Sequence, residues 1–259
     1  MGGLFSGLIG GLIFGGATIV GSVAMLFFDQ SFEHENKIEK KLEYLLGFLL
    51  VFIVLIFITP VFEKFYQFSF SKNYELWSLV IAFLVGTLFI SLATRFVEEM
   101  ADTNISFKIY DEKKATILLL LTIVKTIPSG LASGAAINIG HQGLSFSIVT
   151  GIGMHALFQG AVAALCFMQL GIDPVLTMIG SLFFAFIGLA ASAVGGFLGY
   201  QNLNFIPIIF SFVAGTLITP KVQEIFRKIE QKEGRWKLNP NFVSGVIVTV
   251  IFIVWKELL

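Results

Sequence analysis

Residues 123–134 read IVKTIPSGLASG and place a lysine and a proline inside an otherwise apolar stretch. A charged side chain at the centre of a bilayer costs about 3 kcal/mol on insertion scales, so it is kept where a partner or a water-filled cavity receives it. Pro128 lacks a backbone donor and disfavours helix at the preceding residue, so the helix should kink or unwind beside Lys125. Transporters place binding sites at such interrupted helices. The stretch therefore predicts a substrate pathway that includes Lys125, Thr126, Pro128 and Ser129.

A second polar pattern follows in MHALFQGA, at residues 154–161. His155 and Gln159 repeat the spacing of Lys125 and Ser129, and a glycine follows each pair. Residues four apart lie on one face of a helix. Two such faces can line one cavity, so we expect His155 and Gln159 to complete the pathway.

The composition is that of a membrane protein. Of the 259 residues, 56% are hydrophobic and 13% are charged, which is too apolar for a soluble domain. Apolar runs of about twenty residues recur along the chain and indicate membrane-spanning helices, whereas a β-barrel would show short alternating segments. The net charge is zero, so we expect the lipid bilayer as a partner and no nucleic acid.

The apolar runs predict an all-α polytopic membrane protein with eight spans. No low-complexity linker divides residues 1–259, so we expect a single transmembrane domain. The first span has no basic segment before it and no clear cleavage site, which favours a retained helix over a signal peptide. The predicted spans are 4–28, 42–62, 76–97, 115–138, 146–170, 175–199, 205–220 and 241–257.

Basic residues indicate the orientation. Lys and Arg are concentrated in the connections after the first, third and seventh spans. The positive-inside rule then places these connections in the cytoplasm and both termini outside, in a membrane of the bacterial cytoplasmic (inner) type. The seventh span ends in alternating apolar and charged residues at 219–237, which predicts a helix that runs on into the cytoplasm or lies on the headgroups.

Enzyme chemistry finds no support in the sequence. Paired carboxylates, a nucleophile triad and a cofactor motif are all missing, so we expect neither catalysis nor a cofactor. Cys166 is the single cysteine, lies in an apolar run and is expected to pack as a small hydrophobe.

Several strings, taken in chain order, resemble the ZIP (zinc- and iron-regulated transporter-like) family in its short eight-span prokaryotic branch. The fourth-span pattern of that family, His-Asn-x-Pro-Glu-Gly-Leu-Ala-x-Gly, aligns without a gap to KTIPSGLASG at 125–134. Its second copy, in the fifth span, aligns to HALFQGAVAALCFMQLGIDP at 155–174. The first, second and seventh helices of the family are similar to GLIGGLIFGGATIVGS at 7–22, YLLGFLLVFIVLIFITPVFE at 44–63 and AGTLITPKVQEIF at 214–226.

The resemblance implies a ZIP-like helical bundle with inverted three-helix repeats, often a homodimer, in which the fourth and fifth spans form the pathway. It also implies transport of a divalent metal ion of the zinc or iron type. The family's His, Asn and Glu ligands correspond here to Lys125, Thr126 and Ser129, and to His155, Ala156 and Gln159. A further acidic ligand of the sixth span falls at Ala191 or Ser192. His155 is thus the one surviving candidate ligand, and no metal site is intact.

Charge arguments lead to the same result. Between Lys114 and Lys221 the formally charged side chains are Lys125 and Asp173, and Asp173 is expected in a turn before Pro174. Zinc takes about four N, S or O ligands. Two like charges 4 Å apart repel by about 4 kcal/mol at an effective dielectric near 20, so the ammonium opposes a zinc ion beside it. The residues therefore disfavour zinc.

Three functions remain compatible with the sequence. The chain is a ZIP-type metal transporter with an altered site, or a ZIP-fold protein that carries an anion or other small solute past Thr126, Ser129, His155 and Gln159. The third is a non-transporting subunit of a membrane complex, in which Lys125 donates hydrogen bonds to Gln159 or Ser129 and locks the bundle.

Overall fold

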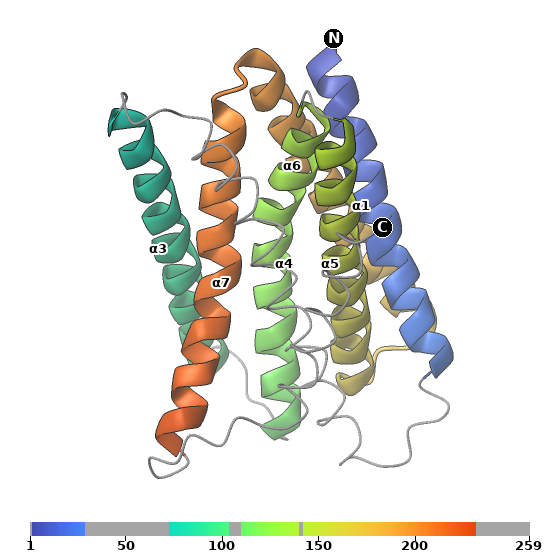
Figure 1. The fold of residues 1–259 in the computed structure, drawn as a ribbon. Coiled ribbons are helices and arrows are strands. Elements are labelled where there is room, and N and C mark those ends of the chain that lie inside the picture. The colour runs from blue at the N-terminus through green and yellow to red at the C-terminus, as the bar shows by residue number, and fades with distance from the viewer. Residues whose placement is uncertain (1, 29–72, 104–109, 140–141, 232–259) are drawn as a thin grey trace, which may run out of the picture.

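The computed structural model describes residues 2–28, 73–103, 110–139 and 142–231. Regular structure in these ranges is entirely helical, and the helices run alongside one another, with α3 and α7 at one side of Figure 1, α4 and α5 between, and α1 at the other side. The helices are α1 (Gly2–Phe28), α3 (Asn73–Thr103), α4 (Tyr110–Ile137), α5 (Gln142–Gln169), α6 (Pro174–Gln201) and α7 (Phe205–Gln231).

Five of these helices are long and apolar enough to cross a membrane. In hydrocarbon the backbone must satisfy its own hydrogen bonds, which a helix does within one segment. Large apolar side chains such as Leu88, Phe186 and Phe5 are exposed on the outside of the bundle, as lipid contact requires. The candidate spans are Gly2–Leu26, Trp77–Met100, Ala115–Ile137, Ile148–Gln169 and Pro174–Gln201, and α7 adds a shorter apolar stretch, Phe205–Pro220. The chain is therefore an integral membrane protein.

The turn between α5 and α6 is built from residues suited to it. Gly171 has φ of 72°, a left-handed conformation that glycine adopts without steric cost. Asp173 caps α6, where its Oδ1 accepts hydrogen bonds from the backbone N–H of Val175 at 2.7 Å and of Leu176 at 3.0 Å. Pro174, which needs no donor partner at this position, opens the helix. The predicted turn at Asp173 is confirmed.

Glycines and serines join α1, α4, α5 and α6 closely. A Cβ at Gly7 would lie 2.6 Å from the Ser192 carbonyl oxygen, so glycine lets α1 and α6 approach. Ser192 Oγ also donates to the Gly7 carbonyl at 2.7 Å. Ser133 Oγ of α4 donates to the Gly10 carbonyl of α1 at 2.7 Å, and Ser22 Oγ of α1 donates to the Gly160 carbonyl of α5 at 2.9 Å. We call these four helices the serine-linked group.

The other pair, α3 and α7, is joined in a similar way. Ser211 Oγ donates to the Leu79 carbonyl at 2.7 Å, and four residues on, a Cβ at Gly215 would collide with the Phe83 carbonyl. Four residues further, Thr219 Oγ1 donates to Thr87 Oγ1 at 3.1 Å. Contacts that advance together by four residues make the two helices parallel.

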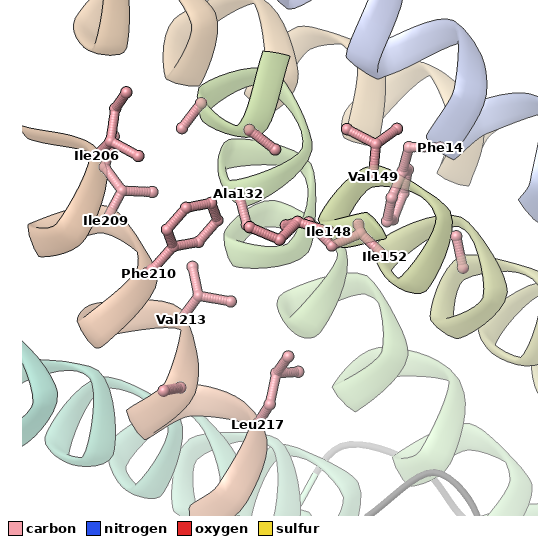
Figure 2. Close-up of a cluster of buried hydrophobic side chains, with 14 residues drawn as sticks. Phe14, Ala132, Ile148, Val149, Ile152, Ile206, Ile209, Phe210, Val213 and Leu217 are labelled. Atoms are coloured by element: carbon pink, nitrogen blue, oxygen red, sulfur yellow. The ribbon is translucent and has the colours of Figure 1, made fainter. Parts of the chain in front are cut away.

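An apolar seam separates the α3–α7 pair from the serine-linked group. Figure 2 shows the Phe210 ring of α7 directed toward Ala132 of α4, with Ile148 and Ile152 of α5 beyond it. Phe210, Val213 and Ala132 are at most 1% exposed. Because lipid tails are as apolar as these side chains, van der Waals packing stabilises the contact between the two groups of helices.

Six predicted spans coincide with α1, α3, α4, α5, α6 and the first part of α7. The spans predicted at 42–62 and 241–257 lie outside the described residues. The helix predicted to continue beyond residue 220 is confirmed, because α7 runs to Gln231. Of the kink or unwinding predicted at Pro128, the unwinding does not occur, since α4 remains helical through this residue to Ile137.

Candidate functional site

A stripe of hydroxyl side chains runs along the buried face of α4. Thr122 Oγ1 donates to the Leu118 carbonyl at 2.7 Å, Thr126 Oγ1 donates to the Thr122 carbonyl at 2.9 Å, and Ser133 donates to α1 as described above. Ser129 is fully buried, yet its hydroxyl has no hydrogen-bond partner in the described part of the chain. Ser129 therefore differs from the other hydroxyls of the stripe, each of which donates to a backbone carbonyl.

Gln159 of α5 is also buried without a hydrogen bond. Its side chain is 8% exposed, and neither Nε2 nor Oε1 has a hydrogen-bond partner among residues 2–28, 73–103, 110–139 and 142–231. A primary amide offers two donors and an acceptor oxygen. Leaving a buried polar group unsatisfied costs about 1–3 kcal/mol, so this amide destabilises the fold. Its presence is therefore not explained by stability.

The register of α4 against α5 brings the predicted residues to one level. Ser145 Oγ donates to the Ala136 carbonyl at 2.8 Å, where the antiparallel pair α4 and α5 begins. Lys125 precedes Ala136 by eleven residues, and Ala156 follows Ser145 by eleven residues. Because both helices rise by about 1.5 Å per residue, Lys125 lies at the level of Ala156 and within about one turn of His155 and Gln159.

Ser129 lies one turn further along α4 than Lys125. Lys125 and Ser129 lie on the face of α4 that also carries Ala132, which Figure 2 places beside Ile148 and Ile152 of α5. Lys125 is partly buried and His155 is 8% exposed. We call Lys125, Ser129, His155 and Gln159 the α4–α5 polar cluster.

The cluster lies near the middle of the candidate spans of α4 and α5. Lys125 is the eleventh residue of the 23-residue span Ala115–Ile137, so about 15 Å of apolar helix extends on either side of it. Pro128, which is fully buried, has no N–H and leaves the Val124 carbonyl without its usual helical donor. A carbonyl acceptor therefore lies next to the ammonium-bearing residue.

Two of the predicted pathway residues have structural roles. Thr126 satisfies its hydroxyl within α4, and its methyl group would lie 3.4 Å from a Cβ at Gly188, so it packs toward α6. Pro128 is buried within α4 and has no polar side-chain atom to offer. In contrast, Ser129 Oγ and the Gln159 amide are buried polar atoms without a hydrogen bond in the described residues.

A lysine lock through these groups is not formed. Lys125 was expected to donate to Gln159 or Ser129 in the non-transporting alternative, but both side chains lack a hydrogen-bond partner in the described residues. That prediction is wrong for both acceptors, because Ser129 Oγ and the Gln159 amide form no hydrogen bond within the described residues.

The cluster does not fit a zinc ion. Within the described ranges, no three His, Cys, Asp or Glu side chains gather as a metal-binding group. Asp173 is exposed and its carboxylate is occupied at the N-terminus of α6. His155 is the one imidazole in the cluster, and its neighbours Ser129 and Gln159 are neutral ligands that zinc rarely takes.

The sequence pattern identified the cluster residues but not which hydroxyls were already used. Ser129 and Ser133 both follow a helical spacing, and only Ser133 lies opposite a carbonyl that it can donate to, that of Gly10 in α1.

Comparison of the sequence with protein-family models finds no matching family, and comparison with curated proteins finds no match.

Proposed function

We propose that this chain is a membrane transporter of the ZIP type, with a substrate pathway that passes the α4–α5 polar cluster. The observation that carries the proposal is Gln159, a side chain 92% buried at mid-membrane depth whose amide has no hydrogen-bond partner within the described residues. Polar groups in membrane helices are expensive and mark substrate paths. Ser129 and Lys125 at the same level add a hydroxyl and a charge to this path.

Repeated contacts support the inverted-repeat part of the proposal. Gly130 of α4 lies against Gly188 of α6, and Gly160 of α5 lies against Thr18 of α1. A shift of 30 residues takes Gly130 to Gly160, and a shift of 170 residues takes Thr18 to Gly188, so the two contacts are equivalent.

Contacts between α1 and α6 also join residues that are 170 positions apart in the sequence. A Cβ at Gly15 would lie 3.3 Å from Ala185 Cβ, and these two residues are also 170 apart. Phe14 and Phe184, again 170 apart, are both fully buried. This pairing supports an exchange of α1 with α6 and of α4 with α5 by a two-fold axis in the membrane plane, the arrangement of inverted repeats.

The proposal includes the remaining features of the ZIP type. These are eight spans, a homodimer, both termini outside and a bacterial cytoplasmic membrane. Divalent metal is the substrate that the resemblance implies, but the donor set of the cluster favours a substrate other than a divalent metal ion. A non-transporting subunit is less well supported, since the lysine lock on which it depended is not formed.

The test is the accessibility of the cluster from each side of the membrane. In a Cys166→Ala background, single Ser129→Cys and Gln159→Cys variants of the full chain are reconstituted in oriented vesicles and treated with a membrane-impermeant charged maleimide. We expect labelling from either side, because a transport pathway opens to both. Ala163→Cys is the matched control, as this fully buried α5 residue lies one turn from Gln159.

Labelling of both cluster variants at the slow rate of Ala163→Cys would contradict the pathway. Labelling from one side alone would contradict transport and leave a one-sided binding pocket.

A further inference from the structure

We propose that the described helices form one of two conformations, which differ in whether the α1–α4 contact or its repeat-related counterpart between α5 and α6 is closed. The proposal rests on the transport function above and names the step that turns the pathway from one side of the membrane to the other. We call the side that holds the start of α1 the N-terminal side, and the side that holds the α5–α6 turn the turn side. The described conformation is closed at the N-terminal side.

Backbone atoms of α1 and α4 touch at the N-terminal side. A Cβ at Gly10 would lie 2.6 Å from the Ser133 carbonyl oxygen, so the two backbones are in direct contact. Ser133 Oγ also donates to the Gly10 carbonyl at 2.7 Å. A buried hydrogen bond of this kind stabilises the contact that it spans. We call this pair of residues the α1–α4 latch.

The repeat relation places the counterpart of the latch between Gly180 of α6 and Ala163 of α5. A shift of 170 residues takes Gly10 to Gly180, and a shift of 30 residues takes Ser133 to Ala163. In the described residues, the three atoms nearest to a Cβ at Gly180 belong to the Phe167 ring, at 2.5, 2.6 and 3.3 Å. An aromatic ring therefore lies where the α1–α4 latch has backbone against backbone.

The Phe167 ring is a side chain that can leave this position. Phe167 is half-buried near the end of α5, and its ring lies edge-on to Phe184 of α6, with centroids 6.1 Å apart and planes at 82°. Side chains change rotamer readily, and packed interfaces switch between discrete arrangements. Withdrawal of the ring lets the small Ala163 approach Gly180, which closes the turn side.

Sequence differences between the two contacts set the balance between the conformations. Ala163 has no hydroxyl to donate to Gly180, whereas Ser133 has one for Gly10. The hydrogen bond of the latch is therefore made in one conformation and has no counterpart in the other. Because a stabilising contact present in one state shifts the population toward that state, the described conformation is the favoured one.

The experiment measures the side from which the cluster is labelled. Gln159→Cys on the Cys166→Ala background is reconstituted as the full chain in oriented vesicles, and the maleimide rate at the N-terminal side is divided by the rate at the turn side. Ser133→Ala removes the latch, so we expect this ratio to rise about fivefold, the factor for one net hydrogen bond. Ser211→Ala removes a similar bond between α7 and α3 and, as the matched control, should leave the ratio unchanged.

A second variant tests the turn side with the latch intact, and it also covers the case in which Ser133→Ala fails to fold. Ala163→Ser combined with Phe167→Ile gives α5 the residues that α4 carries at the equivalent positions, serine and isoleucine. The ring is then gone and a donor faces Gly180, so the ratio should rise here as well. Phe183→Ala, at an exposed position of α6, is the control for loss of an aromatic ring and should leave the ratio unchanged.

The outcomes separate this proposal from the transport function. Labelling from both sides with an unchanged or lower ratio in either folded variant would overturn the two conformations and leave the pathway standing. Labelling from neither side, or from one side alone in every variant, would contradict transport and this proposal with it.

Discussion

Two serines one helical turn apart on α4 illustrate how residue-scale chemistry separates structure from function. Ser133 is 1% exposed and donates to the Gly10 carbonyl, which ties α4 to α1. Ser129 is fully buried and has no such partner in the described residues. The first hydroxyl stabilises the fold, while the second costs stability.

These serines therefore predict opposite results on truncation. Ser133→Ala should lower the free energy of unfolding by about 1 kcal/mol, because it removes a buried hydrogen bond between α4 and α1. Ser129→Ala should leave stability unchanged or raise it. Thermal unfolding of both variants in detergent measures the difference, and an equal loss in both would show that Ser129 is bonded in the fold.

The buried amide of Gln159 predicts a trade of stability against transport. Gln159→Leu keeps a similar volume and removes the unsatisfied polar atoms, so the free energy of unfolding should rise by about 1–3 kcal/mol. Substrate flux should fall sharply in the same variant. Gln169→Leu, at an exposed position near the end of α5, is the control and should change stability by less than about 0.5 kcal/mol. A destabilised Gln159→Leu would show that the amide supports the fold.

At the scale of elements, close backbone approach decides which helices pair. Gly134 of α4 faces the Ser192 carbonyl of α6, and an added Cβ would collide with that backbone oxygen. A backbone atom cannot move aside as a flexible side chain can. The α4–α6 contact, which supports the polar cluster from behind, therefore requires glycine at this position.

A pair of glycine variants tests this requirement. Gly134→Leu should prevent α4 and α6 from packing, and we expect little monodisperse protein in detergent. Gly16→Ala is the control, because a Cβ at Gly16 meets nothing within 4 Å and alanine favours helix by about 1 kcal/mol. Size-exclusion profiles of the two variants give the comparison, and a normal profile for Gly134→Leu would contradict the close α4–α6 approach.

At the scale of the whole molecule, the polar cluster lies within a group of helices held by serine hydroxyls and glycine contacts. The α3–α7 pair meets this group along an apolar seam around Phe210 and Ala132 (Figure 2). Exposed apolar side chains surround the bundle. Consequently the mid-membrane polar atoms are screened from lipid by packed helices, as the high cost of polar groups in hydrocarbon demands.

Much of the described fold was predictable from one sequence. Long apolar runs need no partner to be recognised as spans, because in lipid each helix satisfies its own backbone. The turn predicted at Asp173 and Pro174 is confirmed for a similarly local reason, since the Asp173 side chain caps α6. The unwinding expected at Pro128 does not occur, since the buried packing of α4 against its neighbours keeps this proline within a helix.

The sequence likewise predicts one part of the candidate site, and the packing of the helices decides the other. Lys125, Ser129, His155 and Gln159 stand out in the chain because polar residues at helical spacing interrupt apolar runs, a feature that depends on local chemistry alone. Which of the hydroxyls remain open to a ligand depends on carbonyls from helices distant in the chain, such as Gly10 opposite Ser133. Hydrogen-bond satisfaction is a property of two surfaces in contact, so it was settled when α1, α4, α5 and α6 packed together.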